Sequence, residues 1–458
     1  MMRKEIFKNI TLVTLIFISV LLFSKIWLGS NFDATLFARR REDVQLIAIE
    51  GIIMPKRIVI TGNNKRCSII KGSGGYSECY AAVTDFFRSA DASSIKFETA
   101  ADTEWRAALK SKSVLLDYGS VYSSAVLSKA VIDMPEGNIK ELVIAPGSTA
   151  LSKPVLYTKN ADTGEILKTE CGSGYGRLSD ITGKYLSDDK ISNLPFAFEL
   201  GFDKVRTLNT ELSQNTLLDS NIIIGLTAAG IPNINAVCPT SLINSEEGTA
   251  DALLAALNFK TVSTRRYIEK DDVLVFVDSK ATLRINKKGY IEYTAEAGGI
   301  PLGDAGTVGK NDAALALETM YSLVRSVSKT FDMSEVPVQI YSDITTGVSD
   351  TENVYMDYYV NGMPVMIENG EDTAHTISFK VRGGMIVGFK QYIYEFSDAQ
   401  TESYSESMVS AINKLNEKYT GKTMYVSDMY NAYVCGEDGV HVRWYARVKG
   451  ADPVKITE

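Results

Sequence analysis

The sequence predicts an α+β fold: one N-terminal transmembrane helix followed by extracytoplasmic domains of antiparallel sheet plus helices, the last two related as a repeat. Three observations support this. Residues 9–28 are apolar or hydroxylic except for Asn9 and Lys25. Over much of the remaining chain, apolar residues alternate with polar ones and turn glycines interrupt them, which is typical of strands. The same order of hairpin, helix and hairpin also occurs twice after Asp271.

The first predicted element is a transmembrane helix at residues 9–28. At about 1.5 Å per residue it reaches roughly 30 Å, the thickness of a hydrocarbon core. The run ends in Lys25, Ile26, Trp27 and Leu28 rather than in the small residues that a signal peptidase requires. We therefore favour a retained anchor over a cleaved signal peptide or a buried core helix.

Within this helix, small hydroxylic residues are of the kind enriched where membrane helices pack closely, and a tryptophan suits the headgroup region. The residues that we expect at a partner's transmembrane helix are Thr11, Thr14, Ser19 and Trp27.

Orientation is predicted from the basic residues on each side of the span. Arg3, Lys4 and Lys8 lie in residues 1–8, the predicted cytoplasmic tail, but residues 29–43, the predicted juxtamembrane linker, contain the basic run 39–41. Because a long folded domain is translocated largely regardless of charge, we expect the bulk of the chain outside the cell membrane. The protein would then be a single-pass membrane protein with a cytoplasmic N-terminus.

Composition limits the possible partners and cofactors. The 458 residues are 45% hydrophobic and 23% charged, an ordinary globular balance, and the net charge of −8 argues against a nucleic-acid partner. No C-x-x-C motif occurs among the five cysteines, so neither a disulfide scaffold nor a zinc site is predicted. A bridge between Cys67 and Cys79 stays open beside the alternative of small buried thiols.

Three outer domains are predicted. Residues 44–212 form the first, with strands such as "SVLLDYG" and "ELVIAPG" and one helix, "SECYAAVTDFFRSA". Residues 213–345 form the second, which opens on the helix "SEEGTADALLAALNF" with Ser245 as its N-cap. Residues 346–458 form the third.

The predicted repeat extends over the second and third domains. Its first copy consists of the hairpin "ATLRINKKGYIEYTAE", the helix "AALALETMYSLVRSVSKTF" and the strands "VQIYSDITTG" and "NVYMDYYVNG". Its second copy consists of "HTISFKVRGGMIVGFKQY", the helix "SESMVSAINKLNEKY" and the pair "MYVSDMYNAYVCGEDGVHVRWYARVKG". Asp343 aligns with Asp428. Chance similarity between two hairpin-rich segments is the alternative.

Motifs of catalysis are missing from the sequence. His375 and His441 are the only histidines, and each lies in a predicted strand without a second histidine nearby. The sequence contains no G-x-S-x-G elbow and no phosphate-binding glycine loop, so we predict no catalytic residue, no cofactor and no metal. A cell-wall hydrolase would need a carboxylate pair, for which Asp117 and Glu199 are the candidates. A binding module for an envelope polymer or a peptide is a third class, which a pocket lined by tyrosines would favour.

The sequence contains, in order, a short tail, one span, "IMPKRIVITG", a C-terminal "YYVNGMPVMIENGEDTAHTISFKVRGGMIVGFKQYIYEF", a helix and "YVSDMYNAYVCGEDGVHVRWYARV". This order resembles that of the YycH family and its relative YycI. These proteins are membrane-anchored regulators of the WalK sensor histidine kinase in a two-component system of Gram-positive bacteria. The resemblance implies a non-enzyme that acts by contact through its outer domains and its transmembrane helix. It implies two partners, a WalK-like kinase and a YycI-like single-span protein.

Overall fold

The computed structural model of the chain describes residues 51–62, 65–90, 95–147, 153–172, 175–187, 194–204, 206–208, 212–214, 216–239, 247–259, 263–286, 289–302, 312–345, 352–370, 372–419, 423–449 and 453–457. The chain divides into two units, residues 1–51 and 52–458, and the second contains all the elements described below. The predicted tail, span and linker lie outside the described residues, as do Thr11, Thr14, Ser19 and Trp27. Among the described residues, no helix is long and apolar enough to cross a membrane.

The N-terminal half of the second unit is built on a seven-stranded antiparallel sheet with the order β2-β1-β4-β5-β6-β7-β3. Its strands are β1 (Arg57–Gly62), β2 (Lys65–Ile70), β3 (Glu98–Ala100), β4 (Ser113–Ser123), β5 (Asn138–Ala145), β6 (Val155–Asn160) and β7 (Ile166–Glu170). The first eight residues of β4 are buried, so the middle of the sheet is covered on both faces.

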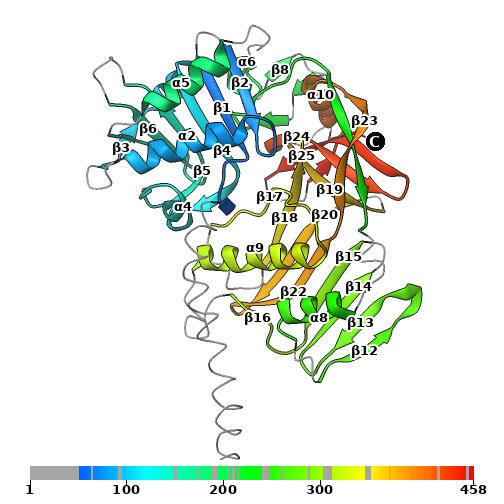
Figure 1. Cartoon of the computed structure of the whole chain (residues 1–458). Coiled ribbons are helices and arrows are strands. Elements are labelled where there is room, and N and C mark those ends of the chain that lie inside the picture. The colour runs from blue at the N-terminus through cyan, green and yellow to red at the C-terminus, as the bar shows by residue number, and fades with distance from the viewer. Residues whose placement is uncertain are drawn as a thin grey trace, which may run out of the picture. The chain divides into compact units, whose positions relative to one another are not determined.

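Several helices cover this sheet. They are α2 (Tyr76–Ser89), α3 (Asp102–Lys110), α4 (Ser124–Ala130) and α5 (Tyr175–Leu186). The short helix α6 (Ala197–Leu200) instead places Ala197 in a cluster with C-terminal residues such as Ala411. Helices α2 and α5 lie side by side (Figure 1). Helix α3 packs its buried Trp105 and Leu109 into a cluster with the sheet residues Leu115 and Val143.

The prediction of a single helix in this region was therefore wrong. Helix α5 has a weak sequence signal because Gly176 and Gly183 lie within it, and each glycine destabilises a helix by about 1 kcal/mol relative to alanine. Burial of Leu178 and Ile181 offsets that cost.

The C-terminal half is built on a larger sheet of fifteen strands, whose main path runs β12-β13-β14-β15-β22-β21-β18-β19-β24-β25-β26. The strands on this path are β12 (Arg265–Ile268), β13 (Leu274–Val277), β14 (Ala281–Asn286), β15 (Tyr290–Ala295), β18 (Glu352–Val360), β19 (Met363–Asn369), β21 (Ile377–Arg382), β22 (Met385–Tyr392), β24 (Met424–Gly436), β25 (Gly439–Val448) and β26 (Val454–Lys455). The strands beside it are β10 (Thr216–Leu218), β16 (Ile300–Pro301), β17 (Val338–Ile340) and β20 (Asp372–His375).

The remaining elements are two small ribbons and the C-terminal helices. The ribbons pair β8 (Arg206–Leu208) with β9 (Leu212–Gln214), and β11 (Ala229–Val237) with β23 (Glu395–Ser405). The helices are α8 (Glu247–Ala256), α9 (Ala313–Thr330), α10 (Met408–Lys418) and the 3₁₀ turn η3 (Lys270–Asp272). Helix α10 begins after Ser407, whose side chain accepts a hydrogen bond from the Ser410 amide, and its buried face packs on β24 and β25.

The structure confirms an α+β fold with largely antiparallel sheets. Hairpins β14–β15 and β21–β22 form where the alternation and the turn glycines predicted them, with Gly289, Gly383 and Gly384 in the left-handed region. Helices α2, α8, α9 and α10 occupy the predicted segments. The three domain boundaries and the internal repeat stay predictions.

Candidate functional site

The two sheets meet along the second half of β4, and a bulge makes this possible. The register of β4 against β5 shifts between Asp117 and Tyr122. Within the bulge Gly119 has a φ of 76°, and its amide donates to Asp117 Oδ1 at 2.9 Å. A Cβ at this position would lie 2.8 Å from Lys56 Cδ. The bulge therefore requires glycine, and it turns the end of β4 toward the C-terminal sheet.

From Ser120 onward, β4 is hydrogen-bonded to the end of β17 and to the segment that follows it. Ser120 Oγ lies 2.9 Å from the carbonyl oxygens of Ile340 and Tyr341. The Ile344 amide donates to the carbonyl of Val121 at 2.7 Å, and the Ser123 amide donates back to Ile344 at 2.8 Å. We call this contact between the two sheets the junction.

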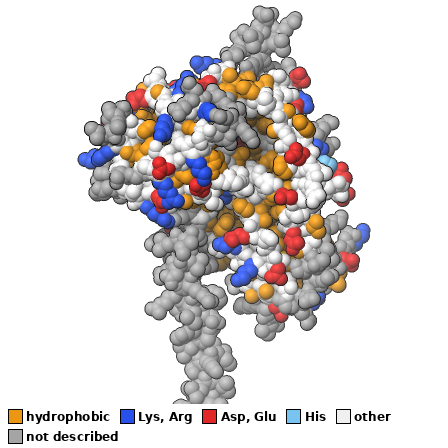
Figure 2. Space-filling model, turned by 45° about the horizontal axis from the view of Figure 1, so that its top comes forward, with side chains coloured by type: hydrophobic (Ala, Val, Ile, Leu, Met, Phe, Trp, Pro, Cys, Tyr) orange, Lys and Arg blue, Asp and Glu red, His pale blue; other side chains and the backbone are white. Residues whose placement is uncertain are grey.

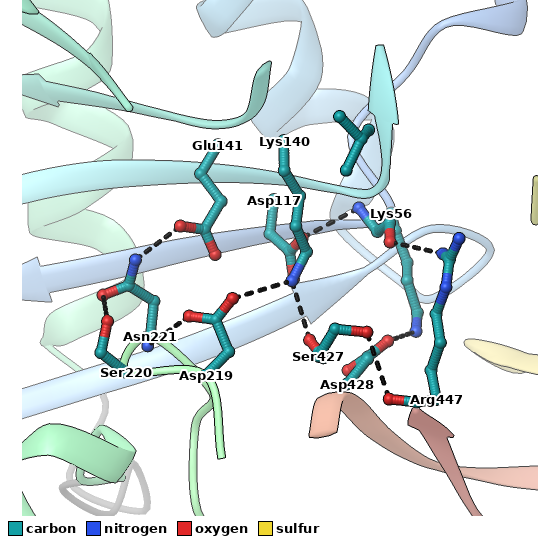
Figure 3. A network of polar contacts seen from close by, with 12 residues as sticks. Lys56, Asp117, Lys140, Glu141, Asp219, Ser220, Asn221, Ser427, Asp428 and Arg447 are labelled. Carbon is teal, nitrogen blue, oxygen red and sulfur yellow. Dashed lines mark hydrogen bonds and ion pairs between the residues drawn. The ribbon is translucent and has the colours of Figure 1, made fainter. Parts of the chain in front are cut away.

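A buried ionic cluster lies at the centre of the junction (Figure 3). Asp428 on β24 forms ion pairs with Lys56 and with Arg57, whose Nη2 lies 3.1 Å from Asp428 Oδ1 and 2.9 Å from Asp117 Oδ2. The Asp428 side chain is only 4% exposed. Burial by itself would raise the pKa of Asp428, but the two adjacent cations hold it well below its usual range. Asp428 is therefore ionised throughout the physiological range.

A second polar group adjoins this cluster. Lys140 Nζ on β5 donates to the Ser427 carbonyl at 2.8 Å and lies 3.6 Å from Asp219 Oδ2. Beside it, the buried Glu141 accepts a hydrogen bond from Asn221 Nδ2 at 2.5 Å. Burial, followed by repulsion from Asp219, raises the pKa of Glu141 to about 7. Glu141 therefore titrates near neutral pH.

Lys71, just after β2, makes a further contact across the junction. It is 4% exposed, and its Nζ donates to the Val338 carbonyl at 2.9 Å and to Gln339 Oε1 at 3.1 Å. Both acceptors are neutral, and burial lowers the pKa of Lys71 to about 7.

A cleft of about 860 Å³ opens at the junction, and Lys140 and Glu141 line it. Residues of the N-terminal sheet and of the turn between β6 and β7 form one wall, and residues after β17 and on β24 and β25 form the other. Arg447 spans the two walls: it donates to the Gly119 carbonyl at 2.8 Å and to Asp343 Oδ1 at 2.8 Å. The Tyr341 ring lies 4.5 Å from its guanidinium. The volume is in the range of small-molecule sites.

The two carboxylates considered for a hydrolase do not come together. Asp117 pairs with Arg57, whereas Glu199 pairs with Arg66 at 2.8 Å. Arg66 lies opposite Thr61, four residues along β1 from Arg57, which is roughly 13 Å at 3.3 Å per residue. Each carboxylate serves as the partner of its own arginine.

The histidines have structural surroundings. His375 Nδ1 lies 2.7 Å from Asp357 Oδ2, and its ring contacts the rings of Tyr341 and Tyr355. His441 lies on β25, 3.1 Å from Asp438 Oδ1. No group of three or more potential metal ligands occurs within the described ranges.

The cysteines are all free thiols, Cys67 and Cys79 included, so the structure does not form the bridge that the sequence left open. Cys79, Cys171 and Cys435 are buried, whereas Cys67 and Cys238 are half-buried.

Most of the junction was not predicted from the sequence. Lys56 and Arg57 occur in "IMPKRIVITG", where two cations precede an apolar strand, and this was the only local signal for them. Asp343 and Asp428 were singled out as an aligned pair, and both lie at the junction, where Arg447 binds the first and Lys56 and Arg57 bind the second.

Comparison with known proteins agrees with this architecture. No family model matches the sequence, and no curated protein matches it. Among solved structures, YycH from Bacillus subtilis is similar with a TM-score of 0.56 and 12% identity, covering 90% of this chain and 97% of that one. An uncharacterized protein from Eubacterium rectale has a TM-score of 0.32 and 12% identity, covering 54% and 87% of the two chains.

At this identity the likeness concerns the fold alone. The class that the structure defines is an α+β protein of two sheets joined at a buried ionic junction. The fold is YycH-like, as the resemblance of the sequence predicted.

Proposed function

We propose that this chain is a membrane-anchored extracytoplasmic regulator of a sensor histidine kinase, acting by contact rather than by catalysis. One observation carries the proposal: a YycH-like fold that covers 90% of this chain and 97% of its structural neighbour. Its partners would be a WalK-like kinase and a YycI-like single-span protein, as the family resemblance implies. The anchor would be residues 9–28, with the outer domains outside the cell membrane.

Regulation by contact needs only modest energies. A contact that favours one kinase state by about 1 to 3 kcal/mol changes the ratio of the two states by roughly 5-fold to 150-fold. The outer domains and the transmembrane helix are the two surfaces through which this chain would supply such a contact.

The proposal is tested by deleting the gene and measuring transcription from a promoter under the control of the kinase. We expect a changed output that the full chain restores, and we expect the kinase to co-purify with the full chain from detergent-solubilised membranes. Unchanged transcription together with failure to co-purify the kinase would contradict the proposal.

A separate test concerns the transmembrane helix. We predict that replacing residues 10–28 by leucines, with Lys25 and Trp27 kept, weakens regulation at equal expression, and that Thr11→Val with Thr14→Val does so in part. Interhelical hydrogen bonds in membranes average about 0.6 kcal/mol, so loss of two would change the kinase equilibrium a few-fold. The matched control is Thr11→Ser with Thr14→Ser, which keeps both hydroxyls. Full regulation by the leucine helix would make the helix a tether only.

The cleft at the junction bears on a second candidate, an anchored binding module, because its volume is that of a small-molecule site. We expected tyrosines to line such a pocket, but most of the side chains around this cleft are polar or charged, and Tyr341 is the one tyrosine among the described lining residues. The hydrolase alternative loses its carboxylate pair, because Asp117 and Glu199 bind different arginines.

A further inference from the structure

The charged side chains that line the cleft differ in whether they have a hydrogen-bond or ion-pair partner among the described residues. Eight charged side chains line it: Lys140, Lys159, Arg447, Lys449, Glu141, Asp162, Asp219 and Asp343. By formal charge they cancel. Charged side chains of both signs are also mixed over the face shown in Figure 2. What matters is which of the eight already have a partner.

Each of the four acids is engaged. Asp343 accepts from Arg447 and from the Val121 amide, both at 2.8 Å. Asp219 faces Lys140, and its Oδ1 accepts from the Asn221 amide at 3.3 Å. The remaining two accept from asparagine side chains, Glu141 from Asn221 at 2.5 Å and Asp162 from Asn138 at 2.6 Å. A cation entering the cleft would have to compete with these donors.

Among the described residues, two of the four cations have no hydrogen-bond or ion-pair partner. Lys140 and Arg447 are committed to the contacts described above. Lys159, half-buried on β6, and Lys449, exposed just after β25, have no side-chain hydrogen bond or ion pair within the part of the chain that the structure describes. They lie on opposite walls, so among the described residues each wall presents one ammonium group that has no hydrogen-bond acceptor.

The protonation of Glu141 acts in the same direction. Because its pKa lies near 7, part of its negative charge is removed at neutral pH. The net charge of −8 acts at long range and is screened over about 8 Å at physiological ionic strength, whereas a ligand inside the cleft meets the lysines directly.

We propose that the cleft binds an anion with two or more negative groups, carboxylate or phosphate, held between Lys159 of one sheet and Lys449 of the other. The volume of about 860 Å³ is far larger than a single small anion needs, so a ligand with separated charges fits it better. A bound dianion would link the two walls and oppose their separation. The proposal concerns binding alone and is independent of kinase regulation, so the failure of one leaves the other standing.

The test is calorimetric titration of the full chain in detergent with two probes, pyrophosphate and the dicarboxylate glutarate. We expect saturable binding of at least one probe, weakened by added salt, and the tighter probe identifies the chemistry of the natural ligand. In Lys159→Gln with Lys449→Gln, we expect affinity to fall roughly tenfold, as loss of two partly exposed ion pairs implies. The matched control, Lys153→Gln with Lys380→Gln, removes the same charge outside the cleft and should bind as the native chain does.

Thermal unfolding completes the test. Because neither cleft lysine has a partner in the described fold, the double variant should unfold at the native temperature without ligand, and it should lose the rise in that temperature caused by the probe. Three results would overturn the proposal: no saturable binding of either probe, equal affinity in the two double variants, or loss of stability in Lys159→Gln with Lys449→Gln, which would show that these lysines serve the fold.

Discussion

Two residues of the junction titrate near neutral pH, and they do so with opposite effects on stability. Burial lowers the pKa of the Lys71 ammonium and raises the pKa of the Glu141 carboxyl, because in both cases it disfavours the charged form. Both lie where the two sheets meet. The pH dependence of unfolding therefore reports on the burial of these two side chains at the junction.

For Lys71 the folded-state pKa of about 7 lies below the value of 10.5 expected in the unfolded chain. Between these values the unfolded chain binds more protons, so the free energy of unfolding rises with pH by up to about 1.4 kcal/mol per unit. We predict that Lys71→Met loses this contribution. The free energy of unfolding of the variant minus that of the native chain should be greatest near pH 6 and should decline steadily toward pH 10. Urea unfolding of the full chain in detergent at several pH values measures it.

The control for Lys71 is the exposed Lys153, because Lys153→Met removes the same charge from water. Its stability should follow that of the native chain at every pH. If the curves for Lys71→Met and the native chain run parallel, Lys71 is not buried as described.

For Glu141 the sign is reversed. Its folded-state pKa of about 7 lies above the usual 4.5, so the folded chain binds the extra proton between these values and the free energy of unfolding falls as pH rises through them. We predict that Glu141→Gln, which still accepts from Asn221, is more stable than the native chain at pH 8 and that this advantage shrinks toward pH 5. The same urea experiment tests it, with the exposed Glu165→Gln as a pH-independent control.

At the scale of elements, the bulge in β4 determines where the two sheets can touch. The strand first pairs with β1 and β5 inside its own sheet. It then bends at Gly119, and Ser120, Val121 and Ser123 make the hydrogen bonds to the segment after β17. The bulge thus frees Ser120 and Val121 to contact the C-terminal sheet, while β4 pairs with β5 on both sides of it.

We predict that Gly119→Ala lowers the free energy of unfolding by about 1 to 3 kcal/mol, because alanine is strained in the left-handed region and its Cβ would meet the Lys56 side chain. The matched control is Gly183→Ala in α5. No atom lies within 4 Å of the Cβ that this change adds, so a helix-interior alanine should stabilise the chain by about 0.5 to 1 kcal/mol. Equal effects of the two substitutions would contradict the described bulge.

The sequence predicted the elements whose signals are local. Hairpins β14–β15 and β21–β22 combine alternating residues with a turn glycine, and α9 has a long apolar period, so each could be located from neighbouring residues. The junction has no such signal, since Lys56 and Asp428 are 372 residues apart and nothing near either residue identifies the other. The same distance in sequence hid the cleft.

At the scale of the whole molecule, the buried ionic cluster makes the two sheets depend on each other. Lys56 and Arg57 precede and begin the N-terminal sheet, and their anion Asp428 comes from the C-terminal sheet. Buried charges are tolerated only when they are paired, so separation of the sheets would leave three charges to be solvated again.

We predict that Asp428→Asn lowers the free energy of unfolding by about 3 to 5 kcal/mol, because it leaves Lys56 and Arg57 buried with Asp117 as their remaining anion in the cluster. Adding Lys56→Met should recover part of the loss, since the second change removes a cation that no longer has its partner. The coupling between the two positions should then be of order 0.5 to 3 kcal/mol in a double-mutant cycle. The surface pair of Lys184 and Glu78, whose side chains are 60% and 42% exposed, provides the control: Glu78→Gln should leave the stability close to that of the native chain, because water already screens this pair. If Asp428→Asn costs no more than Glu78→Gln, or if its effect and that of Lys56→Met simply add, then the cluster does not hold the sheets together.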